Sequence, residues 1–302
     1  MSLPSVLAIV GPTASGKSAL AVEISQRIDG EVVGTDSMQA YRGMDIGTAT
    51  PTGTEQRDVP HHMIDVWDID QAVSVVEFRD KAREAIEAVR SSGRVPVVVG
   101  GSGLYVRALL EELDFPSTDP NVRAAWDREL DLRGAPALHA ILAERDPAAA
   151  AVIEVNNGRR IVRALEVGEL TGEPFIARLP APVDHYPTIR VGMRIDRATL
   201  DQRIEQRVDL MWAEGFVDEV RRLAAKGLAQ APTASAALGY GPILRYLAGE
   251  IDESEARQLT IDHTRRFARR QQRWFAKDER IQWFDYDDPD LAAVSVELVT
   301  ST

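Results

Sequence analysis

Residues Gly11 to Ser18 read GPTASGKS and directly follow the apolar run VLAIV, Val6 to Val10. The spacing G-x-x-x-x-G-K-[ST] is typical of a loop between a buried strand and a helix, whose backbone N–H groups surround a phosphate. Its lysine adds a mobile positive charge, and its last serine can ligate Mg2+. The predicted phosphate site consists of Gly11, Pro12, Thr13, Ala14, Ser15, Gly16, Lys17 and Ser18.

Outward from this loop, strands alternate with helices through residue 113. Strands are predicted at 6–10, 31–34 and 95–99, and helices at 17–28 and 77–91. This alternation predicts an α/β fold with a parallel sheet that is covered on both faces. Ligands of such sheets gather at the C-terminal ends of the strands. We therefore expect the loop, Asp36 and Ser102 to lie along one edge of the sheet.

The pattern becomes helical after DFPSTDP, residues 114–120, and no further strand is expected before about residue 188. We predict a catalytic core made of residues 1–113 and 188–302, with a helical insertion domain at 114–187. Long helices follow the strand at 188–195 and continue to about residue 277.

Composition limits the possible functions of the chain. It has 302 residues, no cysteine and a formal net charge of −12, so disulfides, thiolate metal sites and a cysteine nucleophile are excluded. The negative charge argues against a nonspecific nucleic-acid coat but does not exclude a local basic stripe. No apolar run approaches the roughly 18 residues of a membrane span. We expect a soluble, cytoplasmic and monomeric protein.

Two features of an ordinary nucleotide hydrolase are missing. The strand at 95–99 ends in Gly100-Gly101, where an acidic magnesium partner would be expected, and no N-K-x-D element follows. Asp36, at the end of the second strand, can instead take a proton from a nucleophile that approaches a bound phosphate compound. From its position alone, Asp36 could also cap a helix or hold a magnesium-bound water.

Six motifs carry a family resemblance: GPTASGKS (11–18), DSMQAYRGMDIGTATP (36–51), PHHMIDVWDIDQAVSVVEF (60–78), VVVGGSGLYVRALL (97–110), NNGRRIVRALEV (156–167) and TRRFARRQQRWFAKDERIQWFD (264–285). In this order they resemble the tRNA dimethylallyltransferases over nearly the whole chain. The resemblance implies a core like that of the P-loop kinases with a helical insertion. It also implies transfer of a dimethylallyl group from dimethylallyl diphosphate to the N6 amine of the adenine 3′ to the anticodon, with Mg2+.

The resemblance also implies roles for individual residues. Asp36 would be the general base, and Lys17, the loop amides and Mg2+ on Ser18 would stabilise the leaving diphosphate. Arginines at 197, 203 and 207 can add to that site, and the resemblance favours Arg197 and Arg203. Expected tRNA contacts are Asp36, Ser37, Met38, Gln39, Ser102, Arg123, Arg159, Arg160, Ile161, Val162 and Arg163. Without the resemblance, the arginines among them could equally form solvated helix surfaces.

A basic segment near the C-terminus is a further candidate for binding tRNA. At about 100° per residue, one stripe of a helix would carry Arg266, Arg269, Arg270, Arg273, Lys277 and Arg280. Phe267 and Trp274 fall on another face, which we expect to pack on the core. We predict that Arg269, Arg270 and Arg273 contact the tRNA backbone, with a merely solvated face as the alternative.

The phosphate loop by itself leaves a second function open, an ATP-dependent small-molecule kinase. That function would require ATP and would leave the basic segment unexplained. The transferase function predicts no requirement for ATP.

Overall fold

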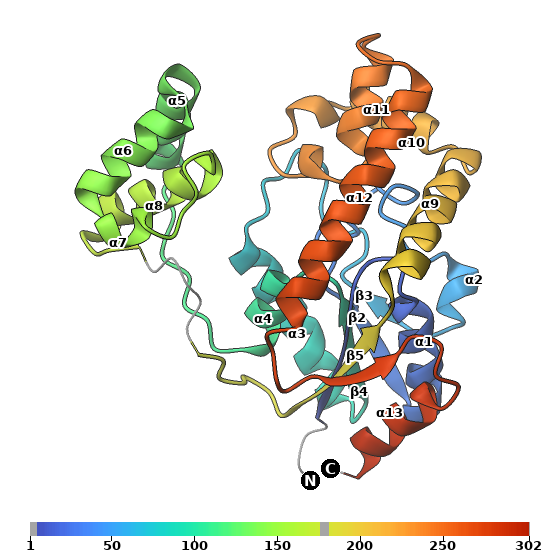
Figure 1. The fold of residues 1–302 in the computed structure, drawn as a ribbon. Helices are drawn as coiled ribbons and strands as arrows, with labels where there is room; N and C mark the ends of the chain where they lie inside the picture. Colours follow the sequence, from blue (N-terminus) through green and yellow to red (C-terminus); the bar gives the residue numbers. More distant parts are fainter. Residues whose placement is uncertain (1–4, 176–180, 302) are drawn as a thin grey trace. The chain divides into compact units, whose positions relative to one another are not determined.

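In the computed structural model, which describes residues 5–175 and 181–301, the chain divides into two compact units. The first unit comprises residues 1–111 with 184–302, and the second comprises residues 112–183 (Figure 1).

The first unit is built on a parallel sheet that runs in the order β3-β2-β4-β1-β5-β6 within the described residues. All its neighbouring strands pair in parallel. Because all the strands point the same way, their C-terminal ends share one edge. The strands are β1 (Val6–Val10), β2 (Gly30–Gly34), β3 (His61–His62), β4 (Val95–Gly100), β5 (Thr188–Arg194) and β6 (Gln282–Asp285).

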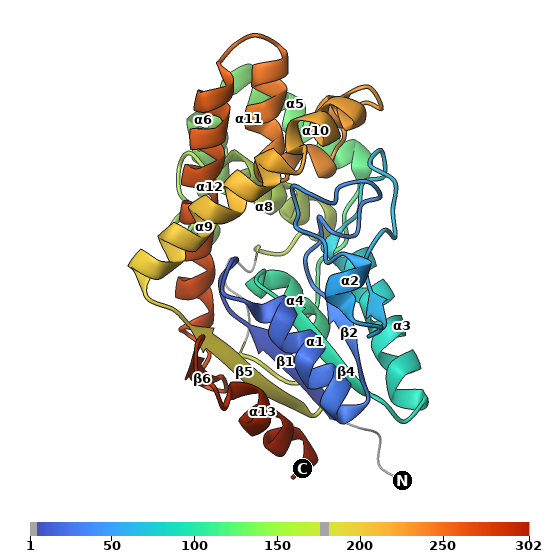
Figure 2. The ribbon, with the colours of Figure 1, turned by 90° about the vertical axis from the view of Figure 1, so that its right-hand side faces the viewer.

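Helices cover both faces of this sheet, as the apolar strands require. Alternate residues of β1 belong to different clusters: Val6, Ala8 and Val10 pack with α3 and α4, whereas Leu7 and Ile9 pack with α1 and α13. Figure 2 gives a second view of this arrangement. The four helices are α1 (Lys17–Ile28), α3 (Val75–Ser91), α4 (Gly103–Leu110) and α13 (Leu291–Thr300).

The remaining helices of the first unit pack beyond the C-terminal edge of the sheet. Phe216, Val220, Tyr240 and Ile243 share an apolar cluster with Tyr41 and Met44, so the loop after β2 is part of this core. The elements are α2 (Gly53–Gln56), α9 (Arg197–Ala213), α10 (Phe216–Ala224), the 3-10 turns η1 (Leu228–Gln230) and η2 (Ala234–Ala236), α11 (Tyr240–Leu247) and α12 (Glu253–Phe275).

The second unit is helical within its described residues and has a core of its own. Leu138, Ile161 and Leu165 are fully buried there, with Trp126 beside them. Its helices are α5 (Pro120–Arg133), α6 (Ala135–Arg145), α7 (Pro147–Ala150) and α8 (Gly158–Thr171).

The predicted α/β class with a parallel sheet is confirmed, and so are the strands at 6–10 and 95–99 and the helix at 17–28. Two edge strands, β3 and β6, were not predicted, because β3 has two residues and β6 lacks the apolar alternation of a strand. None of the helices in the described ranges is both long enough and apolar enough to cross a bilayer.

Candidate active site

The phosphate loop curls between β1 and α1 in a conformation that needs its glycines. Gly16 has a φ of 101°, in the left-handed region where side chains are strained, and it directly precedes the first turn of α1. Lys17 lies back over the loop and donates from Nζ to the carbonyl oxygen of Pro12 at 2.6 Å. The predicted strand–loop–helix context of the phosphate site is therefore present.

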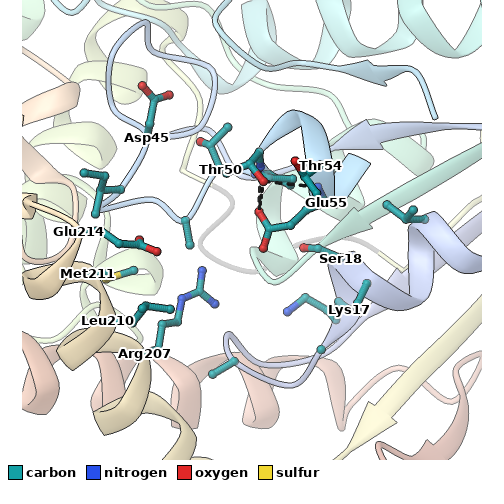
Figure 3. Close-up of a pocket in the computed structure, with 18 of the residues that line it drawn as sticks. Lys17, Ser18, Asp45, Thr50, Thr54, Glu55, Arg207, Leu210, Met211 and Glu214 are labelled. Carbon is teal, nitrogen blue, oxygen red and sulfur yellow. Dashed lines mark hydrogen bonds between the residues drawn. The ribbon is translucent and has the colours of Figure 1, made fainter. Parts of the chain in front are cut away.

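A cavity of about 870 Å³ opens beside this loop, and its volume suits a small ligand. We call it the phosphate-loop cavity. Three segments line it: the start of α1, the stretch from Asp45 to Arg57, and α9. Figure 3 shows Lys17 extending toward Arg207 of α9, with Ser18 next to Lys17 and Glu55 above. Residues of this lining include Lys17, Ser18, Asp45, Ile46, Thr50, Glu55, Arg203, Arg207, Leu210 and Met211.

The cavity is electropositive at its phosphate-loop end. Burial, with a smaller contribution from the nearby Arg207 charge, lowers the pKa of Lys17 to about 7, although the Asp36 charge acts in the opposite direction. A bound anion would favour the charged form of Lys17, because it would supply the negative charge that the surroundings of the amine lack.

Asp36 lies at the carboxyl end of β2, on the same edge as the phosphate loop. Its Oδ1 accepts from the backbone N–H of Met38 at 3.0 Å, so it closes a turn and does not cap a helix. The residue is exposed at the surface. Neighbouring protein atoms nevertheless replace part of the water around the carboxyl, and this desolvation raises its pKa. The charges of Arg207 and Lys17 lower the same pKa, which places Asp36 within their electrostatic reach.

The three candidate arginines of α9 have different surroundings. Arg203 donates from Nε to the carbonyl oxygen of Ala14 at 2.8 Å, and Arg207 reaches the hydroxyl of Thr13 at 3.5 Å. The side chain of Arg197 is 76 % exposed and does not line the cavity. Residues 203 and 207 are four apart and share a helix face, whereas residue 197 lies about 120° away from 203. The geometry thus favours Arg203 and Arg207.

Helix α12 touches the phosphate loop, a contact that the sequence analysis missed. The buried Gln271 accepts from the backbone N–H of Thr13 through Oε1 at 2.8 Å. A β-carbon at Gly101 would lie 2.2 Å from Nε2 of the same side chain, so a larger residue there would displace the Gln271 amide. In the sequence, the only hint of this contact is an uncharged glutamine at position 271 within a segment rich in arginine.

The expectation that Phe267 and Trp274 face the core is wrong for Trp274, which is 41 % exposed. The buried residues of this part of α12 are Ala268, Gln271 and Phe275. Trp274 instead packs beside Gly103, and Phe267 lies half-buried under the guanidinium of Arg270 at 5.6 Å.

The predicted basic stripe is shorter than expected, because α12 ends at Phe275. Arg280 lies beyond the helix and is paired with Glu111, Asp184 and Asp278, so it holds the fold together. Arg270 and Arg273 are exposed, and Arg269 lies 3.7 Å from Asp201. The exposed members of the stripe are Arg266, Arg270 and Arg273 on α12, and Lys277 just after it.

The tRNA residues expected between positions 123 and 163 lie in the helical unit, and two of them cannot use their side chains. Ile161 and Val162 are fully buried in its core, because they form the apolar face of α8. Arg123 and Arg163 both pair with the buried Glu166. Arg159 and Arg160 are exposed at the start of α8.

Ser102 and Ser37 complete the predicted set at the sheet edge. Ser102 directly precedes α4, after the Gly100-Gly101 turn of β4, and Ser37 lies in the turn that Asp36 closes. The loop 11–18, Asp36 and Ser102 thus follow β1, β2 and β4 and lie along one edge of the sheet, as predicted from the sequence.

Fold and site together define an α/β protein of the P-loop class. Comparison with known proteins then identifies the family: the model of the IPP transferase family matches residues 39–278, and the chain belongs to this family.

Similar proteins agree with this identification. The chain is 55 % identical to the tRNA dimethylallyltransferase of Salinispora arenicola over 294 residues, 97 % of this chain and 86 % of that protein. It is 54 % identical to that of Thermobifida fusca over 302 residues, 98 % and 95 % of the two chains. The crystal structure of the tRNA isopentenylpyrophosphate transferase from Bacillus halodurans has a TM-score of 0.72 and 37 % identity, covering 99 % of this chain and 98 % of that one.

Proposed function

We propose that this enzyme transfers a dimethylallyl group from dimethylallyl diphosphate to the N6 amine of the adenine 3′ to the anticodon in tRNA. The family supports transfer to tRNA, since the relatives quoted above are named for that reaction. None of those quoted relatives is named as an ATP-dependent kinase, the alternative that the sequence left open.

The observation that carries the proposal is a carboxylate beside a phosphate site. Asp36 follows β2 and the phosphate loop follows β1, at one edge of the sheet, and Lys17 and Arg207 influence the pKa of Asp36. At the end of β4, where ATP hydrolases carry an acidic magnesium ligand, this chain has Gly100 and Gly101. A β-carbon at Gly100 would lie 1.7 Å from the Thr35 hydroxyl, and Gln271 occupies the equivalent space at Gly101.

The reaction needs two kinds of group, a base near the amine and positive charge near the leaving diphosphate. The lone pair of an adenine amine is delocalised into the ring, so attack on the allylic carbon needs a base for the amine proton. In the proposed step N6 bonds to C1 of the dimethylallyl group, the C1–O bond breaks, and Asp36 takes the N6 proton. Lys17, Arg203 and Arg207 would stabilise the negative charge that collects on the departing pyrophosphate.

The lining of the cavity also fits Mg2+. Ser18 is exposed at the cavity and offers a hydroxyl ligand, and Mg2+ in such sites takes its other ligands from phosphate oxygens and water. No group of three or more acidic or histidine side chains in the described ranges could hold a metal alone. The ion, held by Ser18 and the diphosphate, would neutralise charge on the leaving group.

We propose tRNA contacts in both units. In the first unit they are the turn from Asp36 to Gln39, Ser102 and the exposed arginines of α12. In the helical unit, which we regard as an insertion domain, they are Arg159, Arg160 and the guanidinium groups of Arg123 and Arg163. The monomeric state and the cytoplasmic location stay predictions from the sequence.

Binding of dimethylallyl diphosphate should take up a proton through Lys17. With its pKa near 7, Lys17 is partly neutral at neutral pH, and a bound diphosphate favours the charged form. Affinity should therefore fall as pH rises from about 7.5 to 9. Lys17→Ala should abolish the uptake and weaken binding about 10- to 100-fold. Calorimetry in buffers of different ionisation enthalpy measures both quantities.

The affinity of the same variant for tRNA alone should be unchanged. A Lys17→Ala protein that binds the diphosphate normally but loses tRNA would show that the loop has been assigned to the wrong substrate.

The proposed function is tested by incubating the protein with unmodified tRNA, Mg2+ and dimethylallyl diphosphate in the absence of ATP. Mass analysis of the digested nucleosides should show N6-isopentenyladenosine. Absence of product without ATP, together with ATP turnover, would instead support the kinase.

A further inference from the structure

A buried carboxylate lies outside the cavity and outside the six motifs. Glu219 of α10 is 1 % exposed and does not line the phosphate-loop cavity. Burying such a group costs free energy unless hydrogen-bond donors surround it. The donors around Glu219 therefore indicate what it does.

Four donors meet the two oxygens of Glu219. Oε2 accepts from the backbone N–H groups of Asp45 at 3.0 Å and Ile46 at 2.7 Å. Oε1 accepts from the N–H of Gly47 at 3.1 Å and from the hydroxyl of Tyr240 at 2.7 Å. Burial and the Glu219 charge raise the pKa of Tyr240, so its hydroxyl keeps the proton that it donates. A carboxylate suits this position because both its oxygens accept.

These bonds hold the loop from Met44 to Thr50 against α10. A β-carbon at Gly47 would lie 2.1 Å from the ring of Phe216, so the backbone approaches the helix as closely as glycine permits. Within the loop, the N–H of Thr50 donates to the carbonyl oxygen of Asp45 at 2.9 Å. Glu219 thus ties three consecutive backbone N–H groups of the loop to α10, and the ring of Tyr240 from α11 also packs against Gly47.

The same loop orients Gln39, three residues after Asp36. Its Nε2 donates to the carbonyl oxygens of Thr48 at 3.1 Å and Ala49 at 3.2 Å. Two carbonyl acceptors can be satisfied only by the nitrogen end of an amide, so the orientation of the side chain is decided. Its Oε1 accepts no hydrogen bond from the part of the chain that the structure describes and is left as an acceptor.

We propose that Glu219 is a positioning residue for recognition of the target base. Through the loop 44–50 it fixes the Gln39 amide so that Oε1 faces the exocyclic amine of the adenine. This inference rests on the proposed function. The amine has two N–H bonds, of which Asp36 would accept one and Gln39 the other. A base with a carbonyl at that position would meet two acceptors and be rejected.

A double-mutant cycle tests whether Glu219 acts through Gln39. Glu219→Gln puts an NH2 group against backbone donors and should lower kcat about 10- to 100-fold, since small misplacements near the reacting atoms have effects of this size. In the Gln39→Ala background, the Glu219→Gln change should lower kcat less than about 3-fold. Asp218→Asn is the matched control, because Asp218 is an exposed neighbour on α10 that pairs with Arg221.

Binding provides a readout that a purely structural role would not change. Wild-type protein should bind an anticodon stem–loop with adenosine about 10-fold tighter than one with purine riboside, which lacks the amine. Glu219→Gln and Gln39→Ala should both lose this preference. The inference would be overturned if the kcat losses of Glu219→Gln and Gln39→Ala multiply in the double variant. It would also be overturned if Glu219→Gln keeps the wild-type preference for adenosine over purine riboside. A wild-type protein that makes no isopentenyladenosine would instead refute the proposed function.

Tyr240→Phe keeps the test decisive if Glu219→Gln unfolds. It removes one of the four donors and should lower kcat about 3- to 10-fold, again with little further loss in the Gln39→Ala background. Multiplicative losses in this cycle would also overturn the inference. Thermal unfolding of each variant identifies those that are folded at the assay temperature.

Discussion

Asp36→Asn should lower kcat for dimethylallyl transfer by about 10²- to 10⁴-fold, the range of general-base contributions. The carboxamide can still accept from the N–H of Met38, which keeps the turn, but it cannot take the amine proton. Single-turnover rates with saturating tRNA and diphosphate would measure the loss. Substrate affinities and the unfolding temperature should stay close to those of the wild type.

The pH profile gives this prediction a second readout. Burial raises the pKa of Asp36, so kcat/KM of the wild type should rise with pH as that carboxyl loses its proton. The asparagine variant should lack this acidic limb. Rates within a few-fold of the wild type, with the limb intact, would remove Asp36 from the role of base.

Replacing Arg269, Arg270 and Arg273 together with alanine should weaken the binding of all tRNAs alike. Each phosphate contact contributes a little under one unit to the slope of log affinity against log salt, so the slope should fall by about two to three units. The decrease should be nearer two units, because the negative charge of Asp201 already offsets part of the positive charge of Arg269. Titrations across a salt series provide the slope.

A charge-matched control separates local contact from net charge. Arg221 of α10, Arg245 of α11 and Arg257 at the opposite end of α12 each pair with an acidic residue, and their triple alanine variant removes the same charge. Its salt slope should equal that of the wild type. Equal slopes in both triple variants would return the end of α12 to the role of a solvated face.

The contact between α12 and the phosphate loop would connect the two proposed substrate sites. Gln271 hydrogen-bonds to Thr13, while Arg270 and Arg273 beside it are exposed. The helix proposed to bind tRNA therefore also supports the loop proposed to bind the diphosphate.

Several features of the site were predictable from local patterns. The phosphate loop is encoded by residues 11–18 themselves, and the apolar strands before Asp36 and Ser102 predict that all three lie at one edge of the sheet. Helical spacing alone would also have separated Arg203 and Arg207 from Arg197. The same spacing would have placed Ile161 and Val162 on the apolar face of α8.

By itself, therefore, the sequence determined the fold class, the phosphate loop and the position of Asp36, because short-range spacing and strand ends carry that information. The tertiary structure alone decided what Glu219, Gln271 and Arg280 do. Each meets partners far away in the chain, such as Asp45 for Glu219, Thr13 for Gln271 and Glu111 for Arg280. Periodicity reports which face of a helix is buried, but the partner of a buried polar group depends on how distant segments pack.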